Sequence, residues 1–191
     1  MRLSFCESRP SYVLFEYLPS GAAAPGSAVS LAAQATQLPA RRQNDRVYAV
    51  QADQVPSRLE GARPCVSGVR EDIGGCLIDG PLAYLGITVL QAGDVIEVET
   101  WWRVTEGPIA RNFSIMAHLI TAEGEFVGNA DGLGVWPMML QARDIFVQRH
   151  RFTVPEAHQA LWLRTGAYWL DTMTLWSIDD GDALLVRLAA P

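Results

Sequence analysis

The sequence predicts an all-β protein: an antiparallel β-sandwich, jelly-roll or immunoglobulin-like, with a loop-rich N-terminal extension. Short apolar or alternating segments are separated by Gly-, Asp- and Pro-containing turns at about ten-residue spacing, and no amphipathic segment of usual helix length is present. The 191 residues are 49% hydrophobic and 19% charged, which suits one well-buried domain. We therefore expect residues 46–191 to form the sandwich and residues 1–45 to form an extension packed on it.

The N-terminal third is the least regular part of the chain. Residues 11–19 read as a strand, residues 27–38 as either a short helix or a flexible segment, and residues 46–51 as a strand. A lone apolar strand cannot satisfy its own backbone hydrogen bonds, so residues 11–19 must pair with this chain's sandwich or with another chain. We favour pairing within the chain, because a single domain gains most by burying its own apolar strand. A loop-rich passage follows up to Pro81.

From Tyr84 onward, strands and turns alternate regularly. The turn at residues 91–94 joins two strands, and the turn at residues 122–124 joins two more, which predicts two β-hairpins. Three further strands are expected at residues 145–154, 161–170 and 182–188.

The stretch EVETWWRV contains adjacent tryptophans that cannot share a face of one strand. The even-numbered positions are mostly apolar, so Trp102 is predicted to point into the core. Trp101 then lies on the polar face with Glu99 and Arg103. The indole is either covered by the chain itself, which we favour, or binds a sugar ring with Glu99 and Arg103, or meets a protein partner.

A second candidate ligand-binding surface lies on the strand at residues 161–170. Period-two alternation places Trp162, Arg164 and Tyr168 on one face and Trp169 on the other. With Trp176 nearby, these aromatic residues cannot all occupy one core face, so one face must meet something else. Trp162 and Tyr168 are therefore predicted ligand-binding residues.

The loop LGVWPMML contains too many apolar residues to be freely solvated. It is expected to fold over one end of the sandwich as a lid, which we favour, or to form an interaction patch. Trp136, Met138 and Met139 are the predicted partner-binding residues.

Composition and spacing exclude several function classes. The net charge is −6, there is no Lys, and no basic run exceeds Arg41-Arg42, which argues against nucleic-acid binding. No window reaches the roughly 18 apolar residues of a spanning helix, and no conventional signal peptide is recognised. Neither a GxSxG nor an HxH or HExxH pattern occurs, so His118, His150 and His158 are expected to be structural or solvent-facing. We predict no enzyme activity, no cofactor and no metal.

Two groups of residues have both a functional and a structural interpretation. Cys65 and Cys76 either form a disulfide across a short glycine-rich loop or remain free thiols. The acidic residues at positions 179, 180 and 182 are typical of a hairpin turn rather than a calcium loop. Glu97 and Glu99 share a strand face about 7 Å apart, but every alternating strand produces that spacing.

Several short motifs together resemble one known module. They are Ala92-Gly93-Asp94, Trp102-Arg103, Ala117-His118-Leu119, Glu123-Gly124, Asp131-Gly132, Trp136-Pro137 and Leu161-x-Leu163-x-x-Gly166-x-Tyr168. Over residues 84–188 the chain resembles the extracytoplasmic C-terminal β-sandwich domain of polytopic glycosyltransferase-like membrane proteins of Chloroflexi-type bacteria. The chain departs from this pattern because it lacks the membrane-spanning part and has Gln148 where an acidic residue is expected. The resemblance implies a sandwich on the outer side of a membrane, without catalytic residues and with a role in carbohydrate recognition.

The sequence thus predicts a non-catalytic binding module on the outer side of a membrane, with carbohydrate as the ligand class. The alternative is an accessory or structural subunit that docks on a protein partner or self-associates through aromatic and apolar surface. Ligand identity and oligomeric state are left open.

Overall fold

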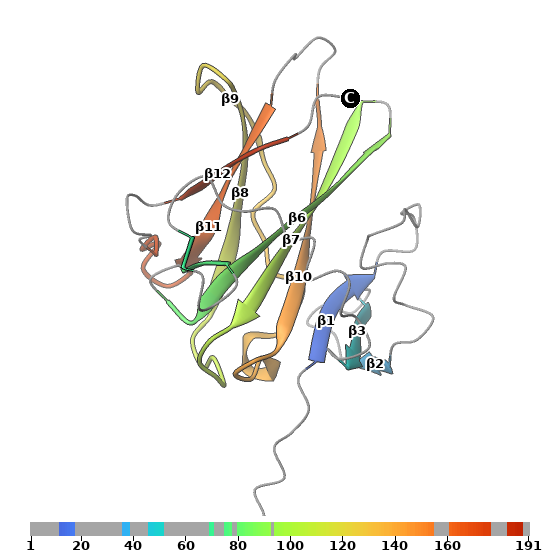
Figure 1. The fold of residues 1–191 in the computed structure, drawn as a ribbon, viewed down its shortest axis with the longest axis vertical. Helices are drawn as coiled ribbons and strands as arrows, with labels where there is room; N and C mark the ends of the chain where they lie inside the picture. Colours follow the sequence, from blue (N-terminus) through green and yellow to red (C-terminus); the bar gives the residue numbers. More distant parts are fainter. Residues whose placement is uncertain are drawn as a thin grey trace, which may run out of the picture.

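A computed structural model describes residues 12–17, 36–38, 46–51, 69–70, 75–77, 80–92, 94–154, 161–176 and 183–188. Two β-sheets pack face to face, which confirms the predicted all-β sandwich (Figure 1). The strands and one 3-10 helix (η3) are β1 (Tyr12–Tyr17), β2 (Thr36–Leu38), β3 (Arg46–Gln51), β4 (Val69–Arg70), β5 (Gly75–Leu77), β6 (Leu82–Ala92), β7 (Val95–Val104), β8 (Phe113–Thr121), β9 (Phe126–Asn129), η3 (Pro137–Met139), β10 (Ile145–Thr153), β11 (Leu161–Trp169) and β12 (Leu184–Arg187).

The large sheet has eight strands in the order β2-β3-β1-β10-β7-β6-β5-β4, and the small sheet has four in the order β12-β11-β8-β9. The predicted hairpins are β6–β7 and β8–β9, each antiparallel. The connections β7–β8, β9–β10 and β10–β11 cross from one sheet to the other, so each layer contributes one face to a shared core.

Strand β1 joins the large sheet by pairing within the chain. Val13, Leu14 and Phe15 lie opposite Ile145, Phe146 and Val147 of β10 in parallel register, while β3 pairs with the other edge of β1. This is the intrachain pairing favoured from the sequence, although its parallel direction departs from the antiparallel expectation. Leu14 is 1% exposed and belongs to the core. The helix or flexible segment expected at residues 27–38 is wrong for its last three residues, because Thr36–Leu38 form strand β2 and pair antiparallel with β3. Residues 27–35 lie outside the described residues, and the domain boundary at residue 45 stays a prediction.

The core lies between the inward faces of both sheets. Trp102 is completely buried and meets Tyr84 edge to face at 5.2 Å between ring centroids, while Phe113 meets Phe146 in the same manner at 6.2 Å. On β8, Phe113, Ile115, Ala117 and Leu119 are all inside, as their spacing predicts. This close packing holds β8 and β11 rigidly, which fixes the side chains on their outward faces.

Candidate functional site

The structure buries Trp101, the most prominent sequence candidate. Trp102 points into the core as predicted, but Trp101 on the opposite face is only 6% exposed and Glu99 only 1%. Because these fractions refer to a single chain, the chain itself covers the indole. An exposed sugar platform formed by Trp101, Glu99 and Arg103 is therefore not present in this structure. Ligand binding through these residues stays a prediction, and it would require Trp101 to become exposed.

Charged groups beside Trp101 form an ion-pair cluster. The Arg149 guanidinium lies 3.4 Å from Glu99 Oε1 and 3.9 Å from Glu97 Oε2. Its side chain is 6% exposed, and those of Glu99 and Glu97 are 1% and 17% exposed. The guanidinium between the two carboxylates offsets the cost of burying their charges. This geometry therefore gives Glu97 and Glu99 a structural role and does not require them to act as an acid–base pair.

The outer face of the small sheet brings other predicted residues together. The pairing of its four strands places outward-facing side chains in two neighbouring rows that run across the sheet. The aromatic row contains Arg187, Trp162, Ile120 and Phe126, and the polar row contains Leu185, Arg164, His118 and Asn129. Rows on one face of a strand are about 7 Å apart.

Both rows are accessible at the end of the sheet that contains Trp162. Phe126 is 64% exposed and Leu185 43%, while Trp162, Arg164 and His118 are half-buried. Apolar rings and hydrogen-bonding side chains thus lie side by side on a rigid strand scaffold.

Tyr168 lies on the same face of β11 as Trp162 and is 9% exposed. Its hydroxyl donates to Asp131 Oδ2 at 3.2 Å, and the other oxygen, Oδ1, accepts the Ala117 N–H at 2.8 Å. His118 Nε2 lies 3.4 Å from that same Oδ1. Burial raises the pKa of the Tyr168 hydroxyl, and the neighbouring Asp131 adds to the shift.

The sequence analysis treated Asp131 as a turn residue and did not include it in a site. In the structure the Asp131 carboxylate takes the place of a backbone carbonyl. The N–H groups of its neighbours Ala130 and Gly132 bond to backbone carbonyls of β8, whereas the Ala117 N–H of β8 bonds to the Asp131 side chain. The Asp131-Gly132 pair in the sequence indicates only an irregular backbone. The contact with Tyr168 could not be read from it.

His150 belongs to a buried hydrogen-bond chain, so of its two expected roles, structural or solvent-facing, the structure shows the first. Its Nδ1 is 2.8 Å from the Ala130 carbonyl oxygen, which can only accept, so Nδ1 carries the proton. Its Nε2 then accepts from the Thr100 hydroxyl at 3.0 Å, and that hydroxyl accepts the Trp102 indole N–H at 2.8 Å. Burial lowers the pKa of His150 to about 4, so the ring is neutral at pH 7.

Gln148, at the position where the resemblance leads us to expect an acidic residue, is also buried. Its Oε1 accepts from Gly134 N–H at 2.7 Å and its Nε2 donates to the Arg149 carbonyl at 2.8 Å. An amide satisfies one donor and one acceptor here, which a carboxylate could not do.

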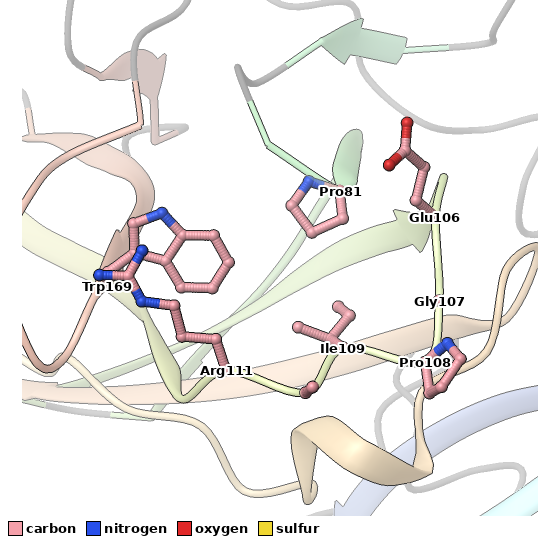
Figure 2. Close-up of a pocket in the computed structure, with 8 residues that line it drawn as sticks. Pro81, Glu106, Gly107, Pro108, Ile109, Arg111 and Trp169 are labelled. Carbon is pink, nitrogen blue, oxygen red and sulfur yellow. The ribbon is translucent and has the colours of Figure 1, made fainter.

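A pocket of about 460 Å³ opens at one end of the sandwich, between the start of β6, the β7–β8 loop and the end of β11 (Figure 2). Its walls are formed by Pro81, Glu106, Pro108, Ile109 and Trp169, with Arg111 beside the indole. The Arg111 guanidinium carbon lies 4.5 Å from the centroid of the Trp169 ring.

Arg111 is already engaged in this pocket. It donates to both carboxylate oxygens of Asp171, at distances down to 2.6 Å, and this hydrogen bonding holds the pKa of Asp171 below its usual value. Its guanidinium also covers Trp169. The pocket therefore offers less hydrogen-bonding capacity to a ligand than its volume suggests.

The loop around Trp136 is partly buried and partly exposed. Val135, Pro137 and Leu140 are buried and anchor the loop to the sandwich, as a lid would be anchored. Trp136 and Met138 are 46% and 63% exposed, and Met139 is half-buried. Whether this patch binds a partner stays a prediction.

The remaining sequence candidates leave few further sites. Cys65, His158 and residues 179–182 lie outside the described residues, so the disulfide and turn assignments stay predictions. Within the described ranges, no three or more His, Cys, Asp or Glu side chains are grouped as metal ligands. No helix in the same part of the chain is long and apolar enough to cross a membrane.

Comparisons with known proteins add little to this geometry. No family model matches the sequence, and no curated protein matches it. A similar solved structure is the crystal structure of the C-terminal domain of Wzt, which is 12% identical with a TM-score of 0.39 over 68% of this chain and 83% of that chain. Similarity at this level supports no statement about what this chain binds. The resemblance of residues 84–188 to the Chloroflexi-type domain stays a prediction.

Proposed function

We propose that this protein is a non-catalytic binding module that holds a saccharide across the outer face of its small sheet. The observation that supports this most directly is the position of Trp162. Its half-buried indole lies between Arg187 and Ile120 in the aromatic row, with Arg164 and His118 one row away. This arrangement replaces Trp101 as the centre of the predicted sugar site.

The chemistry of the two rows matches that of a sugar ring. A pyranose has an apolar face of C–H groups and a rim of hydroxyl groups. The indole of Trp162 and the ring of Phe126 offer flat apolar surface to the C–H face of the sugar. The guanidinium, imidazole and amide groups of the polar row can form hydrogen bonds with its hydroxyl groups. The side chains project from paired strands, so little entropy is lost in ordering the site.

Location on the outer side of a membrane is also part of this proposal, and it depends on the resemblance of residues 84–188. A non-catalytic role is supported by the buried ion pairing of Glu97 and Glu99 with Arg149, which accounts for the two carboxylates without chemistry.

A glycan array followed by fluorescence titration tests the saccharide site. We expect at least one saccharide to bind and to change tryptophan emission. Trp162→Ala should weaken that binding at least tenfold, by about 1.4 kcal/mol or more, while Trp162→Phe retains part of it. Trp136→Ala is the matched control, because it removes an exposed indole outside the face.

Two results would count against the proposal. One is the absence of binding to any saccharide on the array. The other is equal affinity of wild type and Trp162→Ala, with folding of the variant verified by circular dichroism.

The exposed patch of Trp136 and Met138 supports a second candidate function, docking on a protein or on another copy of this chain. Self-association predicts a mass above the 20.9 kDa monomer in sedimentation, reduced to the monomer by Trp136→Ser with Met138→Ser. A monomeric wild-type protein would contradict self-association.

A further inference from the structure

We propose that the saccharide is acidic, and that its carboxylate or phosphate group lies over β11 and β12. This inference rests on the proposed function and assigns the ligand class and its orientation on the same face.

Two arginines lie beside Trp162 in the described part of the small sheet. Arg187 is exposed and lies directly opposite Trp162 across the β11–β12 pair. Arg164, two residues along β11 on the same face, extends along the sheet with its Nη1 3.7 Å from the Met116 sulfur. Arginine's planar, fixed donors suit carboxylate and phosphate oxygens. This local sign is opposite to the net charge of −6 of the whole chain.

The described residues of the two rows include no acidic side chain. The Asp131 carboxylate lies 3.4 Å from His118 Nε2, on the β8 side of the face and two strands away from Arg187. An anionic ligand beside Arg187 would therefore meet no opposing carboxylate among these rows.

Acidic residues at the β9 edge make the charge of the face differ from one edge to the other. Glu123 and Glu125 lie in the turn between β8 and β9, past Ile120 and Phe126. Two to three strand spacings separate this turn from β12, or about 10 to 14 Å. That exceeds the screening length of about 8 Å at physiological salt, so these carboxylates do not cancel Arg187. Among the described residues, the face thus carries arginines on β11 and β12 and is uncharged to acidic toward β9, which orients an acidic saccharide.

Matched pairs of saccharides test the charge requirement. The probes are oligogalacturonates against their methyl esters, and an array of phosphorylated and sialylated glycans beside their neutral parents. We expect at least one acidic probe to bind at least tenfold more tightly than its neutral counterpart, with affinity falling as salt rises. The carboxylated and phosphorylated sets show which acidic group is preferred.

Substitutions then locate the acidic group. Arg187→Gln should weaken binding of the acidic probe about fivefold to tenfold and reduce its salt dependence, whereas Arg187→Lys should retain most of both. Arg151→Gln is the charge-matched control, because Arg151 is an exposed arginine on the large sheet with a 61% exposed side chain. It should leave affinity unchanged, and thermal melts should show that all three variants fold.

The possible failures separate this inference from the function on which it rests. Equal binding of neutral and acidic probes, or an Arg187→Gln variant that binds acidic probes as wild type does, overturns the acidic-ligand inference and leaves the saccharide site standing. Absence of binding to every probe, neutral or acidic, overturns both.

Discussion

Acid should weaken this protein through His150. The ring is 1% exposed, and burial lowers its pKa from 6.5 to about 4, although the bond to Ala130 and the charge of Asp131 act in the opposite direction. The folded protein therefore binds this proton less tightly than the unfolded chain does. Stability from this residue is complete above pH 6.5, declines as the pH falls toward 4, and is lost below that.

The size of the effect follows from the same pKa. Each tenfold difference in proton affinity corresponds to about 1.4 kcal/mol, so a pKa near 4 corresponds to about 3 kcal/mol of stability lost by pH 4. Protonated Nε2 would also lose its role as acceptor for Thr100, which must then turn toward the Gln148 carbonyl at 3.4 Å.

Urea denaturation of wild type and His150→Gln at several values between pH 7 and pH 4 measures this contribution. Other titrating groups are common to both proteins, so the difference between their pH profiles isolates His150. We expect the wild type to lose about 3 kcal/mol more than the variant over this range. Parallel profiles, or an NMR titration that places the His150 pKa near 6.5, would refute the buried neutral ring.

Substitutions at three further sites, with two matched comparison variants, test the packing by urea denaturation. Thr100→Val should cost about 2 to 4 kcal/mol because it leaves both the Trp102 indole N–H and His150 Nε2 unpaired, whereas Thr100→Ser keeps the hydroxyl and should cost about 1 kcal/mol; similar losses would contradict the hydrogen-bond chain. Trp101→Ala should cost about 3 to 5 kcal/mol, comparable to Trp102→Ala, and a loss below about 1 kcal/mol would show that Trp101 is open to solvent. Gly107→Ala should destabilise by about 1 to 3 kcal/mol because a Cβ would lie 2.7 Å from a backbone nitrogen of the segment before β10; an unchanged midpoint would argue against that close approach.

The strands were predictable because their signals are local. Alternation and turn residues identified both hairpins, and the side-chain period of two placed Trp102 inside and Trp162 on the same face as Arg164. The same period predicts which face a residue occupies but not whether that face is covered. Trp101 shows this limit, because its burial depends on chain segments distant in sequence.

Contacts between distant residues account for what the sequence did not reveal. The parallel pairing of β1 with β10 joins residues more than a hundred positions apart, and no local pattern specifies it. Likewise, Asp131 meets Tyr168 only because the irregular backbone after β9 turns its carboxylate onto β8. The pocket beside Trp169 is formed by three separate segments, which only the tertiary fold brings together.

Chemical-shift mapping by NMR, with the wild-type protein titrated with a saccharide that binds it, tests most directly whether the outer face of the small sheet is the binding surface. We predict that the Trp162 indole N–H and the backbone amides of β8, β11 and β12 shift together with saturating concentration dependence. Shifts confined to the pocket lined by residues 106–111, or to the loop around Trp136, would contradict the proposed site.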